Sequence, residues 1–437
     1  MAAQSREVKK LNKIVEAGRT LIVDGPASLN FLSGNAEVLG APLKPNERVV
    51  IRDAKRMPFE VKKKAEFGIM LGEGAGTEEI EGSTIPQSWK DSAEEVLSLE
   101  KKPSVVLVLG RVDVGKSGFC TFLSNNALKR RLRVAVVDGD LGQSDVGPPA
   151  SIGFGRIRRL IKDLFEVNAE DVYFIGITTP SSVIERVIEG LTTMKKKAET
   201  SPGVDFLILN TDGWVEGEDA AKYKLTLTEH IKPSIVVGIQ QQDELTHILG
   251  NLKTENITIE TPKAIKQRDK EKRKVLRELS YKKYLKGAKV LTFPLSWMQI
   301  EGVPLGSGIS PRKPQMAQIQ NLLGLSPLHS EETTTTILLV LGAQQWVHRD
   351  RIKAIEQALG KKVRVMREGD EEGLLVSLQN VDGNFAGIGI LHGIDYQRKT
   401  MKVYTPAKEK VSTISVGQIK LDKDGRELGI NPISTEI

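Results

Sequence analysis

A glycine-rich stretch contains the residues of this sequence that most clearly indicate a chemical function. It runs from Leu109 to Ser117, reads Leu-Gly-Arg-Val-Asp-Val-Gly-Lys-Ser, and matches the Walker A pattern. In that pattern backbone N–H groups surround a phosphate, the lysine reaches the β- and γ-oxygens, and the serine hydroxyl ligates Mg²⁺. An apolar run precedes the stretch and a helix-like run follows it, as the motif requires. We therefore expect a nucleoside triphosphate to be bound by Gly110, Arg111, Val112, Asp113, Val114, Gly115, Lys116, Ser117 and Gly118.

Two aspartates form the second chemical feature. Asp138 and Asp140 end an apolar run two residues apart, so in an extended strand both carboxylates would face the same side, toward the triphosphate. One carboxylate could hold Mg²⁺ and the other could accept the proton of an attacking hydroxyl, which phosphoryl transfer requires. A simple turn-capping role is the alternative for either residue.

Apolar strands alternating with helical segments must position these residues, and this alternation is typical of a parallel sheet with helices on both faces. Polar loops follow most of the strands, and in such sheets the loops at the carboxyl ends of the strands converge on one ligand site. The predicted strands are 104–109, 134–137, 172–177, 206–209, 235–239 and 290–293.

Two further regions flank this sheet. Residues 1–95 contain short alternating runs and glycine-rich turns, which favour a small β-sandwich-like domain. Residues 296–437 favour a β-rich domain with a helix near 349–359. The predicted fold is therefore α/β, with a P-loop NTPase domain at 96–295 between two β-containing domains.

The composition is typical of a soluble intracellular protein, with 39% hydrophobic and 27% charged residues. The apolar runs are too short to span a bilayer, and the opening residues lack the apolar core of a signal peptide. Cys120 is the single cysteine, so an internal disulfide is excluded. We expect a cytoplasmic protein without a membrane partner.

The positive charge is concentrated in one segment. The net charge is +7, and residues 253–289 contain thirteen Lys and Arg against five Asp and Glu. Such a basic stripe in a nucleotide-binding protein indicates a nucleic-acid partner, with an ordinary solvated helix face as the alternative. Arg273 and Arg277 lie four residues apart, on one helix face, and could fold over the site as a lid that stabilises the transferred phosphoryl group.

Two loop residues have open interpretations. Trp214 follows a predicted strand, where its indole either packs against the sheet or stacks on a nucleobase. Thr179, in a Thr-Thr-Pro sequence after another strand, either approaches the phosphates or belongs to an ordinary turn.

Taken together, these motifs resemble the polynucleotide 5′-hydroxyl kinase family, which includes archaeal RNA kinases, the RNA kinase subunit of the pre-mRNA cleavage machinery and rRNA-processing kinases. The order and spacing of several motifs carry the resemblance, and it covers nearly the whole chain. The motifs are the Walker loop, Asp138-x-Asp140-x-Gly142-Gln143, Thr179-Pro180, Asn210-Thr211-x-Gly213-Trp214, and the series Arg268, Arg273, Arg277 and Tyr284.

The resemblance implies ATP- and Mg²⁺-dependent phosphorylation of the 5′-hydroxyl end of RNA, with DNA as the second acceptor. It implies that Asp140 is the general base and that Gln143 orients the metal or its water and contacts substrate. It also implies that Thr179 clasps the γ-phosphate, that Trp214 stacks the terminal base, and that Arg273 and Arg277 form the lid. Two other functions stay open at this point: an ATP-bound scaffold for RNA processing, and an ATPase whose acceptor is water.

Overall fold

The computed structural model describes residues 9–302, 308–408 and 410–430. The chain forms two compact units, which divide between Ser280 and Tyr281 within one helix. The sequence predicts three domains with boundaries at 95 and 295, and that division stays a prediction.

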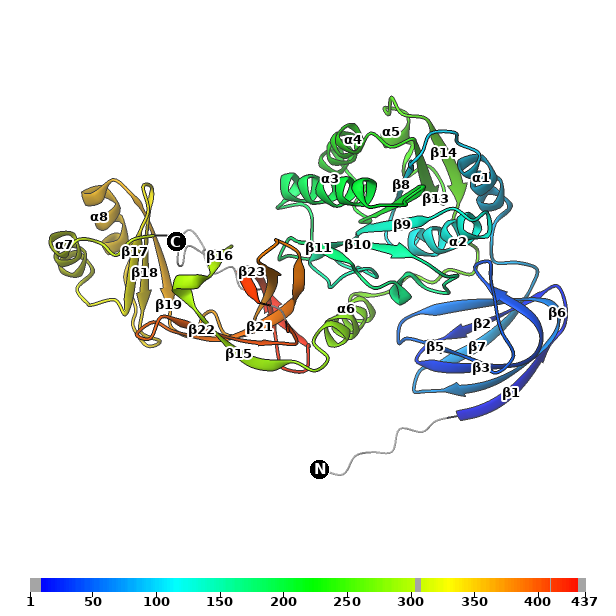
Figure 1. The fold of residues 1–437 in the computed structure, drawn as a ribbon, viewed down its shortest axis with the longest axis horizontal. Coiled ribbons are helices and arrows are strands. Elements are labelled where there is room, and N and C mark those ends of the chain that lie inside the picture. The colour runs from blue at the N-terminus through cyan, green and yellow to red at the C-terminus, as the bar shows by residue number, and fades with distance from the viewer. Residues whose placement is uncertain (1–8, 303–307, 409, 431–437) are drawn as a thin grey trace. The chain divides into compact units, whose positions relative to one another are not determined.

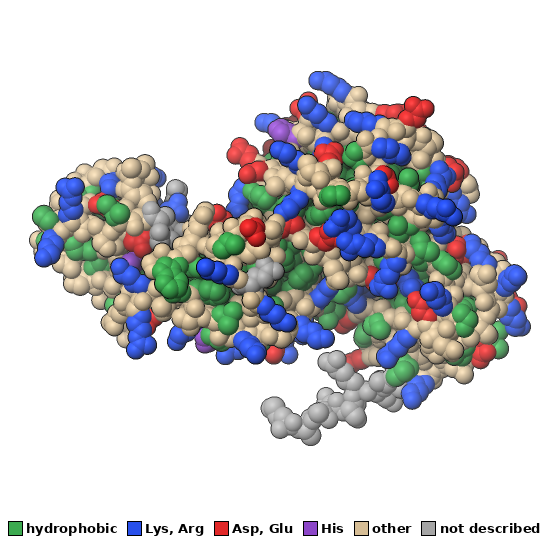
Figure 2. Space-filling model, viewed as in Figure 1, with side chains coloured by type: hydrophobic (Ala, Val, Ile, Leu, Met, Phe, Trp, Pro, Cys, Tyr) green, Lys and Arg blue, Asp and Glu red, His purple; other side chains and the backbone are tan. Residues whose placement is uncertain are grey.

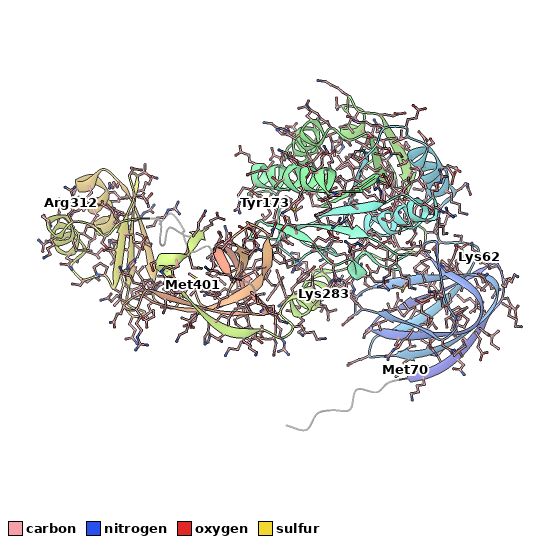
Figure 3. The ribbon with its side chains drawn as sticks, in the orientation of Figure 1. Lys62, Met70, Tyr173, Lys283, Arg312 and Met401 are labelled. Carbon is pink, nitrogen blue, oxygen red and sulfur yellow. The ribbon has the colours of Figure 1, made fainter. Side chains whose placement is uncertain are left out.

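The first unit begins with a seven-stranded antiparallel sheet (Figure 1). The sixteen-residue β6 pairs with β1, β2 and β3, and its alternating side chains separate a core from a solvent face. Phe59 and Phe67 of β6 are buried, whereas Lys62 points outward and ion-pairs with Glu60 (Figure 3). The strands are β1 (Lys9–Val15), β2 (Arg19–Asp24), β3 (Ala27–Val38), β4 (Ala41–Pro42), β5 (Glu47–Ile51), β6 (Arg56–Leu71) and β7 (Gly76–Glu81).

A second seven-stranded sheet follows, in the order β11-β10-β9-β12-β8-β13-β14. Its strands are β8 (Ser104–Gly110), β9 (Val134–Gly139), β10 (Ser151–Ile157), β11 (Asp171–Phe174), β12 (Phe206–Thr211), β13 (Ile235–Gln240) and β14 (Asn256–Glu260). Strands β9, β12, β8, β13 and β14 are parallel, whereas β10 runs antiparallel to both neighbours. The α/β fold with a P-loop sheet is confirmed, and the sheet is mixed rather than wholly parallel.

Helices cover both faces of this sheet because the central strands are apolar on both sides. One apolar cluster joins the sheet to α1 and α2, and the other joins it to α3, α4 and α5 (Figure 1). The helices are α1 (Gln87–Leu97), α2 (Lys116–Lys129), α3 (Ile184–Thr200), α4 (Glu218–Ile231), α5 (Thr246–Leu249) and α6 (Lys270–Tyr284), with the short 3₁₀ helix η1 (Leu164–Glu166). At the sheet edge, Tyr173 of β11 packs against Gly190 of α3 (Figure 3).

One strand prediction is wrong and two strands were missed. Residues 290–293 belong to β15, which pairs with β22 in the second unit, because the chain has already left the first unit along α6. Strand β14 has only one buried residue and so lacks the apolar run that predicts a strand. In β10, Gly153 and Gly155 interrupt the apolar run.

The second unit contains a larger and a smaller sheet. The larger has the order β15-β22-β21-β20-β23-β16 with β24 beside β23, and the smaller has the order β17-β18-β19. Helices α7 and α8 supply apolar residues to the core of the smaller sheet. The elements are β15 (Lys289–Pro294), η2 (Leu295–Trp297), β16 (Gln299–Glu301), α7 (Lys313–Leu323), β17 (His329–Glu332), β18 (Thr336–Leu341), α8 (Arg349–Leu359), β19 (Lys362–Arg367), β20 (Leu374–Asn380), β21 (Phe385–Asp395), β22 (Thr400–Thr405), β23 (Val411–Leu421) and β24 (Glu427–Ile430).

The visible surface carries many Lys and Arg side chains, with Asp and Glu among them (Figure 2). Among the described residues, none of the helices combines the length and the apolar character needed to cross a membrane. Because charge is spread widely over the surface, the role of the basic segment 253–289 has to be judged from what it contacts.

Candidate nucleotide and polynucleotide site

The Walker loop connects the carboxyl end of β8 to the amino end of α2. Gly115 lies directly before α2 with a φ of 103°, a conformation that residues with a side chain rarely adopt. A Cβ on Gly110 would lie 2.8 Å from the carbonyl oxygen of Ile239, so β13 presses against the start of the loop. Backbone N–H groups at the first turn of a helix favour a bound phosphate, and this loop presents such a turn.

Lys116 lies inside the loop that precedes it. Its Nζ donates to the carbonyl oxygens of Gly110, at 3.0 Å, and of Arg111, at 2.7 Å. The residue is 6% exposed. Burial lowers the pKa of Lys116, and the nearby carboxylates of Asp140 and Asp212 partly oppose that shift.

Asp140 lies in the turn after β9 with one carboxylate oxygen engaged. Its Oδ1 accepts hydrogen bonds from the backbone N–H groups of Gly142, at 3.1 Å, and Gln143, at 2.9 Å. Its Oδ2 accepts none from the described residues. Burial raises the pKa of Asp140; the charge of Lys116 opposes this shift, and Asp212 adds to it. The carboxylate is thus held in place by one oxygen while the other is available to a ligand.

Asp138 has different surroundings from Asp140. It is fully buried, and its two oxygens accept four hydrogen bonds, from Asn210 Nδ2 and from the backbone N–H groups of Asp140, Asp145 and Val146. Asn210 can reach it because β9 and β12 pair with these two residues side by side. Burial, and then the charges of Asp145 and Asp140, raise the pKa of Asp138 to about 7. The extended-strand argument expected both carboxylates to face one ligand. Instead, the Asp138 oxygens are taken up by hydrogen bonds within the protein, and only Asp140 has an oxygen available.

The segment before α6 and the start of that helix contact the Walker loop. The backbone N–H of Arg268 donates to Asp113 Oδ2 at 2.9 Å, its Nε donates to Oδ1 at 2.6 Å, and Arg273 Nη1 lies 4.0 Å from Oδ2. Gln143 Nε2 donates to the backbone carbonyl of Arg273 at 3.2 Å. Lys266, in the same segment, ion-pairs with Asp24 of β2 at 3.0 Å. The basic segment thus contacts the Walker loop, the loop after β9 and the N-terminal sheet.

Two cavities adjoin the Walker loop. The larger, about 510 Å³, is bounded by the N-terminal sheet, the Walker loop, the loop after β9 and the basic segment. Among the predicted site residues, Val112, Asp113, Gly115, Lys116, Ser117, Gly118, Asp140, Gln143 and Arg277 line it. The smaller, about 310 Å³, has Arg111, Val112, Asp113, Val114, Trp214 and Arg273 in its lining. Asp113 and Arg268 line both cavities, so their ion pair lies where the two meet.

Trp214 packs against the core and also lines a cavity, so its stacking on a nucleobase stays a prediction. One face of its ring stacks on Tyr223 of α4, with ring centroids 5.8 Å apart and planes at 26°, while the residue also lines the smaller cavity. Its backbone N–H donates to Asp212 Oδ1 at 2.9 Å. Gly213 lies so close to the Walker loop that an added Cβ would be 2.5 Å from the backbone nitrogen of Val112. The indole is therefore held between the core and the cavity.

Thr179 and Ser117 are placed differently. Ser117 lines the larger cavity at the first turn of α2. Thr179 is exposed in the loop between β11 and α3 and is not in the lining of either cavity described. Its neighbour Thr178 approaches Gly142, where an added Cβ would be 3.4 Å from the Thr178 carbonyl oxygen.

Sequence reasoning missed several residues that organise the site. Asp113 was expected only to line the phosphate loop, yet its carboxylate binds Arg268. The buried Lys224 and Tyr223 both donate to Asp212 Oδ2 at 2.8 Å. Arg52 of the N-terminal sheet contacts Asp145. Of these residues, only Lys224 has a signal in the sequence, because a lysine is unusual on the apolar face of a helix such as α4.

The chain is similar to several known proteins. Residues 110–287 match the family model described as the mRNA cleavage and polyadenylation factor CLP1 P-loop. A polyribonucleotide 5′-hydroxyl-kinase of Pyrococcus furiosus is 28% identical over 351 residues, covering 79% of this chain and 95% of the relative. One of Methanocaldococcus jannaschii is 28% identical over 337 residues, covering 76% and 90%.

A more distant relative and a solved structure extend the match over most of the chain. A CLP1 homologue of Nematostella vectensis is 23% identical over 435 residues, covering 93% of this chain and 94% of the relative. The solved structure of a Clp1p–Pcf11p complex has a TM-score of 0.65 at 11% identity, covering 95% of this chain and 98% of that chain, which shows a shared fold. Over most of its length the chain is therefore similar to the archaeal polyribonucleotide 5′-hydroxyl-kinases and to the Clp1 proteins, and residues 110–287 match the CLP1 P-loop.

Proposed function

We propose that this protein transfers the γ-phosphate of ATP to the 5′-hydroxyl end of RNA, with DNA as a second acceptor. The observation that carries the proposal is the Asp140 carboxylate, which lines the same cavity as Lys116 and Ser117 and has one oxygen available. Relatives that cover most of the chain are named polyribonucleotide 5′-hydroxyl-kinases. A carboxylate beside a phosphate-binding loop can accept the proton of an attacking hydroxyl.

The two cavities supply two binding regions on either side of the Walker loop. The larger takes the nucleotide, since the first turn of α2 and Lys116 belong to it. The smaller takes the polynucleotide end, since its lining includes the Trp214 indole and Arg273. Asp113 and Arg268, which line both, keep the basic segment over the phosphates so that Arg273 and Arg277 can stabilise charge on the transferred group.

The donor set at the nucleotide cavity fits a magnesium ion bound together with ATP. Among the described residues no group of three His, Cys, Asp or Glu is arranged to hold a metal ion by itself. The Ser117 hydroxyl at the first turn of α2 would hold Mg²⁺, which neutralises phosphate charge in such sites. We assign Asp138 the positioning of the loop after β9, in place of the metal-ligand role expected from the sequence, because its oxygens are already engaged.

The direct test uses ATP labelled in the γ-phosphate and an RNA oligonucleotide with a 5′-hydroxyl end. We expect label on the oligonucleotide, with a matched DNA oligonucleotide measuring the preference between the two acceptors. An oligonucleotide that already carries a 5′-phosphate is the control and should accept no label. Label found only in free phosphate would instead indicate an ATPase, and no consumption of ATP would indicate a scaffold.

Replacing Trp214 with alanine is expected to raise the KM for the oligonucleotide roughly 5- to 150-fold, because stacking on an aromatic ring contributes about 1–3 kcal/mol per base. The KM for ATP should stay within about twofold, since Trp214 lines only the smaller of the two cavities described. Initial rates measured while each substrate is varied in turn give both constants.

Trp346→Ala is the matched control for this variant. Trp346 is 77% exposed in the second unit, and its replacement should leave both KM values unchanged. If Trp214→Ala changes neither KM but lowers the thermal unfolding midpoint, the indole only packs against Tyr223 and the stacking role is refuted.

A further inference from the structure

A buried charge cluster joins the N-terminal sheet to the loop that follows β9. Arg52 Nη2 donates to Asp145 Oδ1 and to Asp163 Oδ2, both at 2.8 Å. Lys55 Nζ lies 3.2 Å from Asp145 Oδ2 and 3.6 Å from Asp163 Oδ1. The Asp145 side chain is 6% exposed, so this carboxylate depends on the two cations for its neutralisation.

Arg52 and Lys55 lie in the turn between β5 and β6, which is packed closely against Gly25. The backbone N–H of Gly25 donates to the Lys55 carbonyl oxygen at 2.8 Å, and a Cβ at Gly25 would lie 1.9 Å from the Arg52 carbonyl oxygen. The Arg52 guanidinium also lies over the Phe165 ring, 3.7 Å from its centroid. Few alternative positions are therefore available to the guanidinium.

Asp145 belongs to the same loop as Asp140. The backbone N–H groups of Asp145 and Val146 donate to Asp138 Oδ2, at 2.7 and 3.0 Å, while that of Asp140 donates to Oδ1 at 3.3 Å. Asp138 therefore binds the backbone at Asp140 and at Asp145. The side chains of Arg52 and Lys55 bind the carboxylate of Asp145 from the N-terminal sheet. A shift of Asp145 would be transmitted through Asp138 to the turn that holds Asp140.

We propose that Arg52, supported by Lys55, is a positioning residue for phosphoryl transfer: from the N-terminal sheet it fixes the loop whose near end carries Asp140 and Gln143. The inference rests on the proposed kinase function for its catalytic consequence. It assigns the N-terminal sheet a part in placing the general base, separate from any contact that the sheet makes with the nucleotide.

Arg52→Gln is the central variant of the test. We expect kcat to fall roughly 10- to 100-fold, because small displacements of a catalytic group have effects of this size, while the KM for ATP stays within about twofold. Hydrogen–deuterium exchange should increase in residues 141–149 and stay unchanged in β1–β7. Arg52→Lys, which retains the charge but can reach fewer carboxylate oxygens, should recover part of kcat.

Two further variants keep the test decisive. Lys55→Gln removes the contacts of Lys55 with Asp145 and Asp163, which are longer than those of Arg52. It should also lower kcat and increase exchange in residues 141–149, but by less than Arg52→Gln. This variant keeps the test available if Arg52→Gln folds poorly. Arg156→Gln breaks a partly exposed ion pair with Glu170 in the same unit and is the matched control, for which kcat and exchange in 141–149 should not change.

The outcomes separate the competing interpretations. A raised KM for ATP with kcat retained would overturn the inference in favour of a nucleotide contact, since Arg52 also lines the larger cavity. Increased exchange throughout the N-terminal sheet would overturn it in favour of a purely structural role. Unchanged exchange and unchanged kcat would overturn it outright, because Arg52 would then order neither the loop nor Asp140. If the wild-type protein labels no oligonucleotide, the proposed function fails, and the exchange experiment still tests whether Arg52 orders the loop.

Discussion

Replacing Asp140 with asparagine is expected to lower kcat by roughly 10²- to 10⁴-fold while ATP affinity changes by less than about twofold, because general base catalysis contributes a factor of this size. Asparagine keeps an Oδ1 acceptor for the N–H groups of Gly142 and Gln143, so the turn after β9 should persist. The amide cannot accept the proton of the 5′-hydroxyl. Single-turnover transfer of labelled phosphate measures the loss, and equilibrium binding of ATP measures the affinity.

The pH dependence of the wild-type protein gives an independent check on Asp140. A general base works in its deprotonated form, so kcat/KM should fall as the pH drops through the pKa of this carboxyl group. Since burial and Asp212 raise that pKa above the ordinary value of about 3.9, despite Lys116, the acid limb should lie at a higher pH than for an exposed aspartate. The Asp140→Asn variant should lack this limb, and any limb that survives belongs to another group, such as Asp138.

Asp219→Asn is the control for the Asp140 variant. Asp219 is exposed in the first turn of α4, and its replacement should leave transfer unchanged. A parallel loss of ATP binding and transfer in Asp140→Asn would contradict the base assignment and make Asp140 a ligand of the metal instead.

The elements that position the site were largely predictable because their residues carry local signals. The strand before the Walker loop is a continuous apolar run. Outside the site, the helix expected near 349–359 is present as α8. Strand β14 was missed because an edge strand needs little apolar surface, and 290–293 was placed in the wrong sheet because an apolar run does not reveal its partner. Pairing between strands depends on distant residues, and a single segment contains no signal for it.

Site residues that belong to short motifs can also be predicted from the sequence, whereas ion pairs between distant residues cannot. Short sequence motifs predict Lys116, Ser117 and Asp140 as site residues, and all three line the same cavity. The partner of Asp113 lies 155 residues away, and the partner of Arg52 lies 93 residues away. Charge alone could not distinguish Arg268, which binds Asp113, from the exposed basic residues around it. Ion pairs of this kind are decided by tertiary packing, so only the structure identifies them.

Lys224→Met is expected to lower the free energy of unfolding by about 3–5 kcal/mol, because it leaves the Asp212 carboxylate buried without its cation. Lys224 is fully buried, and Asp212 is 4% exposed. Asp212 also holds the backbone N–H of Trp214 and the hydroxyl of Tyr223, so the folded fraction should show a raised KM for the oligonucleotide. Urea denaturation measures the stability, and initial rates measure the KM.

Two comparisons show whether burial of the pair causes this effect. Lys195→Met removes a more exposed lysine that pairs with Glu199 on α3, and should cost only about 0–1 kcal/mol because water already screens that pair. The double variant Lys224→Met/Asp212→Asn removes both charges and should recover part of the stability, since no buried charge is left unpaired. Equal losses for the two lysine variants would show that burial of the Lys224–Asp212 pair has no special effect. A double variant less stable than Lys224→Met would show that the Asp212 carboxylate stabilises the Trp214 loop through Trp214 and Tyr223, independently of Lys224.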